Sequence, residues 1–292
     1  MLSPVIWVPK IAADRYTYLA CSGWALLGGA GLASGWKSWQ RSTIDRRIVV
    51  SLAALPIAVV AALGVLTWNQ AKVWRGSETL WTHAVAARPS SLAYFKLGVS
   101  LAHRGSFPKA IANLEAALAL NPDDADAHSA LGFAFAVQGN QGDAFEQFDD
   151  ALRLSPRLST AHTGLGLLLT RQGKLSEAAE HFRRALESDP RDAQAHTNLG
   201  LILRKWGDWE EAIAHFREAV LVDPESEQAQ YQWGLALAEQ GKLTEATLHL
   251  REAVHINPRN PQAHQRLGEA LLRQGQSGEA EEHFREVSRL RP

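Results

Sequence analysis

Residues 159–192 read STAHTGLGLLLTRQGKLSEAAEHFRRALESDPRD, and residues 193–226, which follow directly, read AQAHTNLGLILRKWGDWEEAIAHFREAVLVDPES. Aligned without a gap, the two segments share Leu-Gly, a second Gly, Glu-Ala, His-Phe-Arg, Ala and Asp-Pro at the same places. Small, apolar and helix-ending residues that return at a fixed interval indicate that one structural unit is repeated along the chain.

The same 34-residue interval extends over the C-terminal two thirds of the sequence. When the repeats are aligned, four positions hold the same residue in every repeat, and each such position is a column of the alignment. The columns are Pro at 122, 156, 190, 224, 258 and 292; Gly at 98, 132, 166, 200, 234 and 268; Gly at 105, 139, 173, 207, 241 and 275; and Ala at 110, 144, 178, 212, 246 and 280. These columns divide the region into six repeats at 91–124, 125–158, 159–192, 193–226, 227–260 and 261–292.

Each column suits one place in a pair of adjacent helices. A glycine such as Gly98 has no side chain and lets two helix backbones approach closely, whereas Gly105 and its equivalents take the left-handed backbone that ends a first helix. The alanine column begins the packed face of the second helix, and proline ends that helix because it has no amide hydrogen. The sequence therefore predicts an all-α solenoid of stacked helical hairpins.

Residues 91–292 resemble the tetratricopeptide repeat (TPR) family, whose pattern is an aromatic residue, Leu-Gly, a large residue, Ala, an aromatic residue, Ala and Pro. The third repeat carries this pattern in Leu165-Gly166, Leu169, Ala178, Phe182, Ala185 and Pro190. The departure is the early aromatic position, which holds Tyr94 and then His128, His162, His196 and His264. The resemblance implies a right-handed superhelix in which the first helix of each repeat lines a concave groove that binds a protein or peptide.

The resemblance also places the residue after each Leu-Gly pair in that groove. The family often has a polar residue there, but five of the six are apolar in this chain. With the basic residues nearby, we expect an apolar strip with a basic flank that fits an extended or helical peptide. The predicted groove residues are Phe95, Val99, Phe133, Thr163, Leu167, Arg171, Thr197, Leu201, Arg204, Lys205, Tyr231 and Leu235. The alternative is that these residues pack between adjacent first helices.

Eight histidines fall in two columns, which are 19 residues apart within a repeat: 128, 162, 196 and 264, and 181, 215, 249 and 283. We expect structural packing rather than a metal site, because no pair at i and i+4 stands beside a carboxylate partner. The sequence shows no nucleophile motif, phosphate-binding loop or paired-carboxylate signature, so we predict no catalytic residue, no cofactor and no enzyme activity. Cys21 is the single cysteine, which rules out an intramolecular disulfide.

Charge is distributed unevenly along the chain. Residues 1–90 contain nine Lys and Arg against three Asp and Glu, whereas residues 91–292 contain 21 against 28. The basic N-terminal part suits anionic lipid, and the acidic repeats argue against a nucleic-acid partner.

Two uncharged apolar stretches, at about 19–36 and 48–68, predict two transmembrane helices within residues 1–70. The loop between them holds Lys37, Arg41, Arg46 and Arg47 against Asp45 alone, which predicts a cytoplasmic loop. The repeats would then lie on the extracytoplasmic side of an inner or plasma membrane. The alternative is a pair of buried helices in a soluble domain.

The repeats are expected to have different surroundings at their two ends. Ser77, Trp81, Ala84 and Pro89 follow the second-helix columns, so residues 71–90 predict a single helix that links and caps the solenoid. The apolar face around Phe284 has no further helix to cover it in this sequence. We expect that the chain is truncated, lacks further repeats or self-associates there.

The residues before the repeats carry a second resemblance. Segment 14–19, DRYTYL, and segment 74–81, WRGSETLW, resemble the end of the membrane module of polytopic TPR proteins, including the O-mannosyltransferase TMTC family. Ala20-Cys21 departs from the Pro-Ser common there. In that family the catalytic acidic residues lie far upstream, so the resemblance implies topology alone. It favours a membrane-anchored TPR scaffold; the alternative is the C-terminal fragment of a TMTC-like glycosyltransferase whose repeats dock acceptor proteins.

Overall fold

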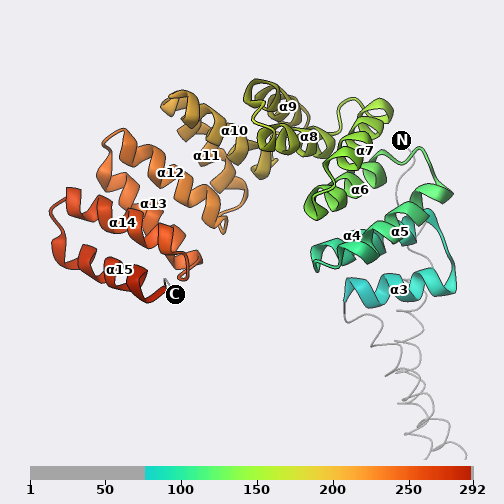
Figure 1. Cartoon of the computed structure of the whole chain (residues 1–292), viewed down its shortest axis with the longest axis horizontal. Helices are drawn as coiled ribbons and strands as arrows, with labels where there is room; N and C mark the ends of the chain where they lie inside the picture. The colour runs from blue at the N-terminus through green and yellow to red at the C-terminus, as the bar shows by residue number, and fades with distance from the viewer. Residues whose placement is uncertain (1–75, 291–292) are drawn as a thin grey trace, which may run out of the picture. The chain divides into compact units, whose positions relative to one another are not determined.

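The computed structural model describes residues 76–290, which form helices joined by short turns (Figure 1). The chain divides into two compact units, Met1–Arg88 and Pro89–Pro292. Within residues 76–290 no helix is long and apolar enough to cross a bilayer. The two stretches predicted to do so, 19–36 and 48–68, lie outside the described residues.

The second unit consists of six helical hairpins, each with a first helix, A, and a second helix, B. The A helices are α4 (Ser91–His103), α6 (Ala125–Gln138), α8 (Ser159–Arg171), α10 (Ala193–Trp206), α12 (Glu227–Glu239) and α14 (Pro261–Arg273). The B helices are α5 (Phe107–Leu120), α7 (Gln141–Leu154), α9 (Leu175–Ser188), α11 (Trp209–Val222), α13 (Leu243–Ile256) and α15 (Ser277–Leu290). The described part of the first unit is one helix, α3 (Ser77–Ala87).

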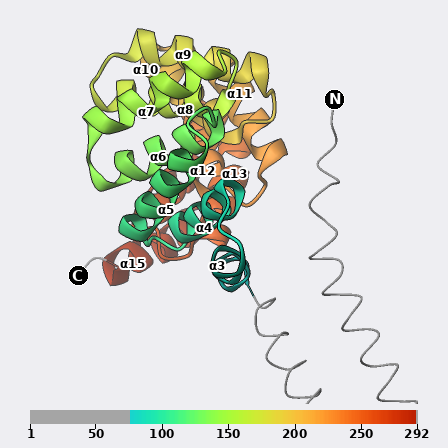
Figure 2. The same ribbon diagram turned by 90° about the vertical axis from the view of Figure 1, so that its right-hand side faces the viewer.

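Successive hairpins of the second unit lie side by side (Figures 1 and 2). Each B helix contacts the A helix that follows it in the chain, and one hairpin occupies each 34-residue period. The all-α solenoid predicted from the repeated columns is therefore confirmed.

Glycine ends every A helix for a backbone reason. The six glycines at these positions have φ between 74° and 90°, a region that strains any residue with a Cβ atom. After Gly207, the amide of Asp208 donates to the carbonyl of Leu203 at 3.0 Å, and this bond closes the end of α10. The turn then leads directly into α11.

The other glycine column allows the two helices of a hairpin to cross closely. A Cβ atom on Gly200 would lie 2.7 Å from Cε1 of Phe216, a ring that is completely buried. Gly164 lies outside the column, yet a Cβ atom there would lie 2.3 Å from the ring of Phe148 in the preceding hairpin. Glycine therefore sets the spacing both within hairpins and between them.

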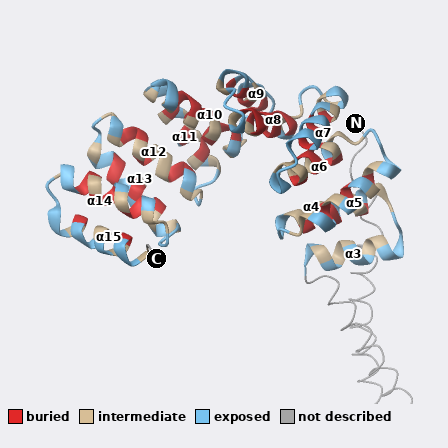
Figure 3. Cartoon of the chain, in the orientation of Figure 1, coloured by how far each residue is buried: buried red, intermediate tan, exposed pale blue. Residues whose placement is uncertain are grey.

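Buried residues occur in every hairpin of the stack (Figure 3), and they form several core clusters along it. Phe148, Phe182 and Phe216 fill successive hairpins, and the alanine column beside them is fully buried. One cluster joins residues from Leu169 to Ala236 across three hairpins. Because each hairpin buries part of its apolar surface against its neighbours, stability depends also on the contacts between adjacent repeats.

Polar residues at the starts of A helices add a second connection between repeats. The carboxylate of Asp192 accepts from the amide of Ala195 at 2.9 Å, which caps α10. Its other oxygen accepts from the hydroxyl of Thr163 at 2.6 Å and of Ser159 at 3.2 Å, both on α8. The same side chain thus caps one A helix and holds the preceding one.

Candidate protein-binding groove

The A helices form the inner layer of the stack. The backbones of successive A helices approach each other closely, whereas those of successive B helices between Phe107 and Leu290 stay farther apart and are joined only by side chains such as Arg251 of α13 and Glu279 of α15. A row of hairpins that touch in one layer and separate in the other curves toward the touching layer. The concave face of this unit is therefore formed by the A helices, as the resemblance implies.

The apolar strip predicted for this face is half-buried. Val99, Phe133, Leu167, Leu201 and Leu235 each pack against a core cluster and keep part of their surface accessible. The ring of Phe133 meets that of Phe148 edge to face, with centroids 5.0 Å apart. Each of these side chains packs inward on one side and leaves surface on the other.

Two of the predicted groove residues lie within the stack instead. Thr163 and Thr197 are buried, and the hydroxyl of Thr197 donates to the carbonyl of Ala193 at 2.8 Å, one turn earlier. The hydroxyl of Thr163 donates a hydrogen bond to the carboxylate of Asp192. Both threonines therefore stabilise the A helices and offer little surface to a ligand.

The position one helical turn before each strip residue is aromatic in two repeats, unlike in the repeats of the two threonines. Phe95 in α4 is half-buried and packs on the core cluster of the first hairpins, with the ammonium group of Lys96 5.1 Å from its ring centroid. Tyr231 in α12 is also half-buried and packs on the C-terminal cluster. These two positions keep the partial exposure that the threonines lack.

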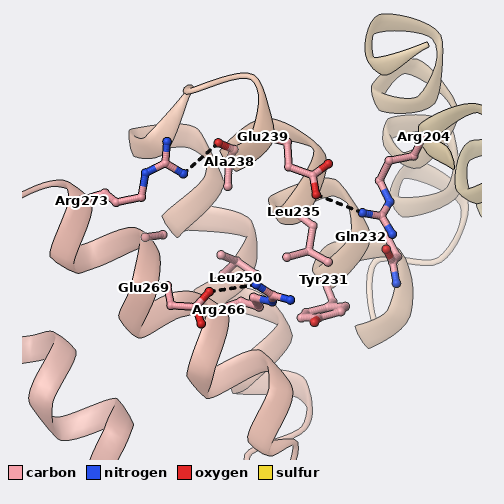
Figure 4. Close-up of a pocket in the computed structure, with 11 residues that line it drawn as sticks. Arg204, Tyr231, Gln232, Leu235, Ala238, Glu239, Leu250, Arg266, Glu269 and Arg273 are labelled. Carbon is pink, nitrogen blue, oxygen red and sulfur yellow. Dashed lines mark hydrogen bonds and ion pairs between the residues drawn. The ribbon is translucent and has the colours of Figure 1, made fainter. Parts of the chain in front are cut away.

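A pocket of about 370 Å³ lies on the A-helix layer, between α10, α12 and α14 (Figure 4). It brings together three predicted groove residues, Arg204, Tyr231 and Leu235. The other lining residues are Gln232, Ala238, Glu239, Leu250, Arg266, Glu269, Ala270 and Arg273. Of these, Glu269 follows the last Leu-Gly pair, so its column marked it as a groove position; the other seven were not among the predicted groove residues.

Ion pairs link charged side chains around the pocket. Arg204 donates to Glu239 of the next A helix at 3.3 Å, and Arg266 donates to Glu269 at 3.0 Å. The hydrogen bond to Glu269 is the main reason that the pKa of Arg266 is raised. Arg273 donates instead to the backbone carbonyl of Ala238 at 3.3 Å.

Two buried polar atoms of this pocket make no hydrogen bond within residues 76–290: Nε of Arg204 and Oε1 of Gln232. One is a donor and the other an acceptor, and they come from adjacent A helices. Buried groups without a partner are uncommon in folded proteins, and an ordered water is a common partner for them.

The histidine columns form pairs inside the hairpins. Nδ1 of His196 lies 2.9 Å from Nδ1 of His215, and Nε2 of His196 lies 3.1 Å from the carbonyl oxygen of Pro190. A carbonyl can only accept, so neutral His196 carries its proton on Nε2, and Nδ1 accepts from His215. His162 with His181, and His264 with His283, repeat this geometry at 3.0 Å. The histidines thus act as A-to-B helix connections.

These pairs predict that the repeat region loses stability in mild acid. Burial lowers the pKa of His215 to about 4, and burial also lowers the pKa values of His162, His181 and His283. Below pH 6.5 the unfolded chain binds protons that the folded chain does not, so stability falls from about pH 6.5 toward pH 4. Circular dichroism should show a melting temperature lower by on the order of 5 °C at pH 5 than at pH 7.

The pair of His128 and Gln147 in the second hairpin suggests a control variant for this prediction. In the second hairpin His128 pairs with Gln147 at 2.8 Å, so glutamine fits the B-helix place. The triple variant His181→Gln, His215→Gln and His283→Gln should flatten the change between pH 7 and pH 5. An equally steep change in the triple variant would assign the effect to other groups.

Models of known protein families match most of the repeat region. Those described as "Tetratricopeptide repeat" match residues 163–230 and 261–292, and one described as "TPR repeat" matches residues 98–139 and 234–275. Together they cover more than half of the chain.

Two curated relatives from Drosophila melanogaster are similar over 124 residues. Protein O-mannosyl-transferase Tmtc1 is 31% identical and Protein O-mannosyl-transferase Tmtc2 is 30% identical, each over 42% of this chain. The match spans only 14% and 12% of the length of these relatives.

Solved structures support the fold. Pseudomonas aeruginosa pilF has a TM-score of 0.64 at 21% identity, covering 69% of this chain and 92% of its own. The anaphase-promoting complex (APC/C) assembly Cut9-Hcn1 has a TM-score of 0.65 at 17% identity, covering 74% of this chain and 43% of its own. PilW, a type IV pilus biogenesis factor, has a TM-score of 0.57 at 19% identity, covering 66% and 90%. At these identities the similarity concerns the fold alone.

Proposed function

Because the chain belongs to the tetratricopeptide repeat family, we propose that it is a scaffold that binds a segment of another protein along its A-helix layer. The observation that carries this proposal is the half-buried apolar strip from Val99 to Leu235, which is continuous with the pocket between α10, α12 and α14. A segment in this groove would cover the exposed parts of the strip and extend into the pocket.

The first test compares two leucines of the same hairpin. Leu201 lies half-buried on α10 in the inner layer, whereas Leu221 lies on α11 in the outer layer and is 68% exposed. The probe is a labelled peptide selected on the unchanged chain. Leu201→Asn should raise the Kd of this peptide at least about tenfold, and Leu221→Asn should leave its Kd unchanged. Fluorescence anisotropy with the full chain in mild detergent measures both.

Melting temperatures separate binding from folding in this comparison. Leu201 also contacts the core, so some loss of stability is expected from its variant. If both variants bind alike while the Leu201 variant melts lower, the inner leucine is a core residue and the groove proposal fails.

The N-terminal part of the proposal is membrane anchoring through 19–36 and 48–68, with the repeats on the extracytoplasmic side. It rests on the uncharged length of these stretches, on the basic loop between them, and on the similarity to relatives named as O-mannosyl-transferases. We expect alkaline phosphatase fused after Trp81 to be active in Escherichia coli, because this enzyme matures only outside the cytoplasm. If the fusion after Trp81 is inactive and a fusion after Ser42 is active, the orientation is the reverse of the one proposed.

The similarity to Tmtc1 and Tmtc2 favours a second function. The chain would then be the C-terminal part of a membrane glycosyltransferase, and its repeats would dock acceptor proteins for that enzyme. The coding sequence immediately upstream of Met1 distinguishes the two: further apolar segments in frame, with acidic residues in the first extracytoplasmic loop, support the enzyme. An in-frame stop codon close to Met1 supports the separate scaffold.

A further inference from the structure

Charged residues divide between the two layers of the solenoid. The six A helices contain six Lys and Arg against four Asp and Glu. The six B helices contain eight against seventeen. The inner layer therefore has a net charge of +2 and the outer layer a net charge of -9, although the repeat region as a whole is acidic.

The acidic residues of the inner layer are already engaged or lie away from the strip. Glu239 and Glu269 pair with Arg204 and Arg266 in the pocket. Glu227 and Asp126 lie in the first turns of α12 and α6, about two turns before the strip residues of those helices, and Glu227 also accepts a hydrogen bond from Asn260. Little negative charge is therefore left along the middle of the groove.

Four basic residues of the inner layer lie outside these two pairs: Lys96, Arg171, Lys205 and Arg273. Arg171 and Arg273 are exposed, and their guanidinium groups donate to the backbone carbonyls of Ala136 and Ala238, at the C-terminal end of the preceding A helix. Such bonds fix the direction of the side chain without neutralising it. Lys205 is exposed at the equivalent place in α10, and no ion pair of residues 76–290 includes any of the three.

We propose that the groove binds an acidic segment of a partner protein, in which apolar side chains alternate with Asp or Glu. This inference rests on the proposed function and adds the chemistry of the ligand. The apolar side chains would lie on the strip around Leu201 and Leu235, and the carboxylates would face the row formed by Arg171, Lys205 and Arg273. The acidic outer layer repels such a segment, so the charge pattern directs it to the inner face.

A nucleic acid or an anionic membrane fits this pattern less well. Both present many phosphates over a long distance and would also meet the seventeen acidic residues of the B helices. A short peptide fits within the inner layer and uses the apolar strip, which a phosphate backbone does not.

The experiment selects ligands from a displayed library of random 12-residue peptides on the full chain in mild detergent. We expect the enriched peptides to be rich in Asp, Glu and apolar residues and poor in Lys and Arg. The triple variant Arg171→Glu, Lys205→Glu and Arg273→Glu should bind the enriched peptides at least tenfold more weakly. The matched control, Arg183→Glu, Arg217→Glu and Arg285→Glu, reverses three exposed charges on B helices and should bind them as the unchanged chain does.

The outcomes separate the two proposals. Enriched peptides that are neutral or basic, yet lose binding with Leu201→Asn, would overturn the acidic ligand and retain the groove. If both triple variants weaken peptide binding equally, binding depends on the net charge of the chain rather than on the basic residues of the A helices. This result also overturns the inference. A selection that yields no peptide sensitive to Leu201→Asn, or displacement of the enriched peptides by a 15-nucleotide DNA strand at lower concentration, contradicts the proposed function itself.

Discussion

The variant Phe216→Ala should lower the free energy of unfolding of the repeat region by about 3–5 kcal/mol. The Phe216 ring is completely buried in the fourth hairpin, directly against Gly200. Truncation leaves a cavity that the surrounding helices fill only in part, because the backbone crossing at Gly200 is already at its minimum spacing. The hairpins on either side then lose part of their contact with each other. Because each repeat is stabilised by its neighbours, this loss lowers the stability of the whole repeat region.

Urea unfolding followed by circular dichroism measures this loss. The matched control is Phe145→Ala in α7, because Phe145 is 44% exposed and its loss should change stability by less than about 0.5 kcal/mol. A similar small effect for both phenylalanines would mean that the packing of the hairpins differs from the one described.

Loss of the Asp192 carboxylate should have the second largest effect. Asp192→Ala removes the cap of α10 and leaves the buried hydroxyl of Thr163 without its acceptor, so we expect a loss of about 2–4 kcal/mol. Asp124→Ala removes the equivalent cap of α6, where the carboxylate accepts from the amide of Ala127 at 3.1 Å. That variant should cost about 1 kcal/mol.

The difference between the stability losses of the two aspartate variants measures how much the bonds from Asp192 to α8 stabilise the contact between repeats three and four. Unfolding in urea at pH 7 gives both values under the same conditions. If the two variants lose the same stability, the bonds from Ser159 and Thr163 to Asp192 contribute nothing beyond the cap.

The sequence predicted the hairpins because their spacing depends on residues whose role is set by the backbone itself. Gly105 and Gly207 need a positive φ, and Gly200 needs the absence of a Cβ atom, so a column of glycine at either place indicates the backbone geometry directly. Gly164 belongs to no such column, and its contact with Phe148 is set by how two hairpins meet. Contacts between repeats therefore became visible only in the structure.

The groove was predicted less completely, because side-chain partners are not encoded by the position in a repeat. Thr163 and Thr197 occupy the same column as Phe95 and Tyr231, yet their short side chains turn to Asp192 and to the carbonyl of Ala193. The bonds of Arg171 and Arg273 to preceding helices join residues 35 positions apart, and a column of mixed residues does not reveal them. The histidine pairs were foreseen as packing, while their ring-to-ring geometry was not.

The central claim is that a partner segment lies on the A-helix layer, and two positions of the fifth hairpin test it most directly. Leu235 lies in the pocket on α12, and Leu248 lies on α13 with 59% of its surface exposed. Each is replaced in the full chain by the photoreactive residue benzoylphenylalanine, and a peptide selected on the unchanged chain is irradiated with each variant at the same occupancy. We predict covalent capture of the peptide at position 235 and none above background at position 248. Capture at position 248 with none at position 235 would contradict the account.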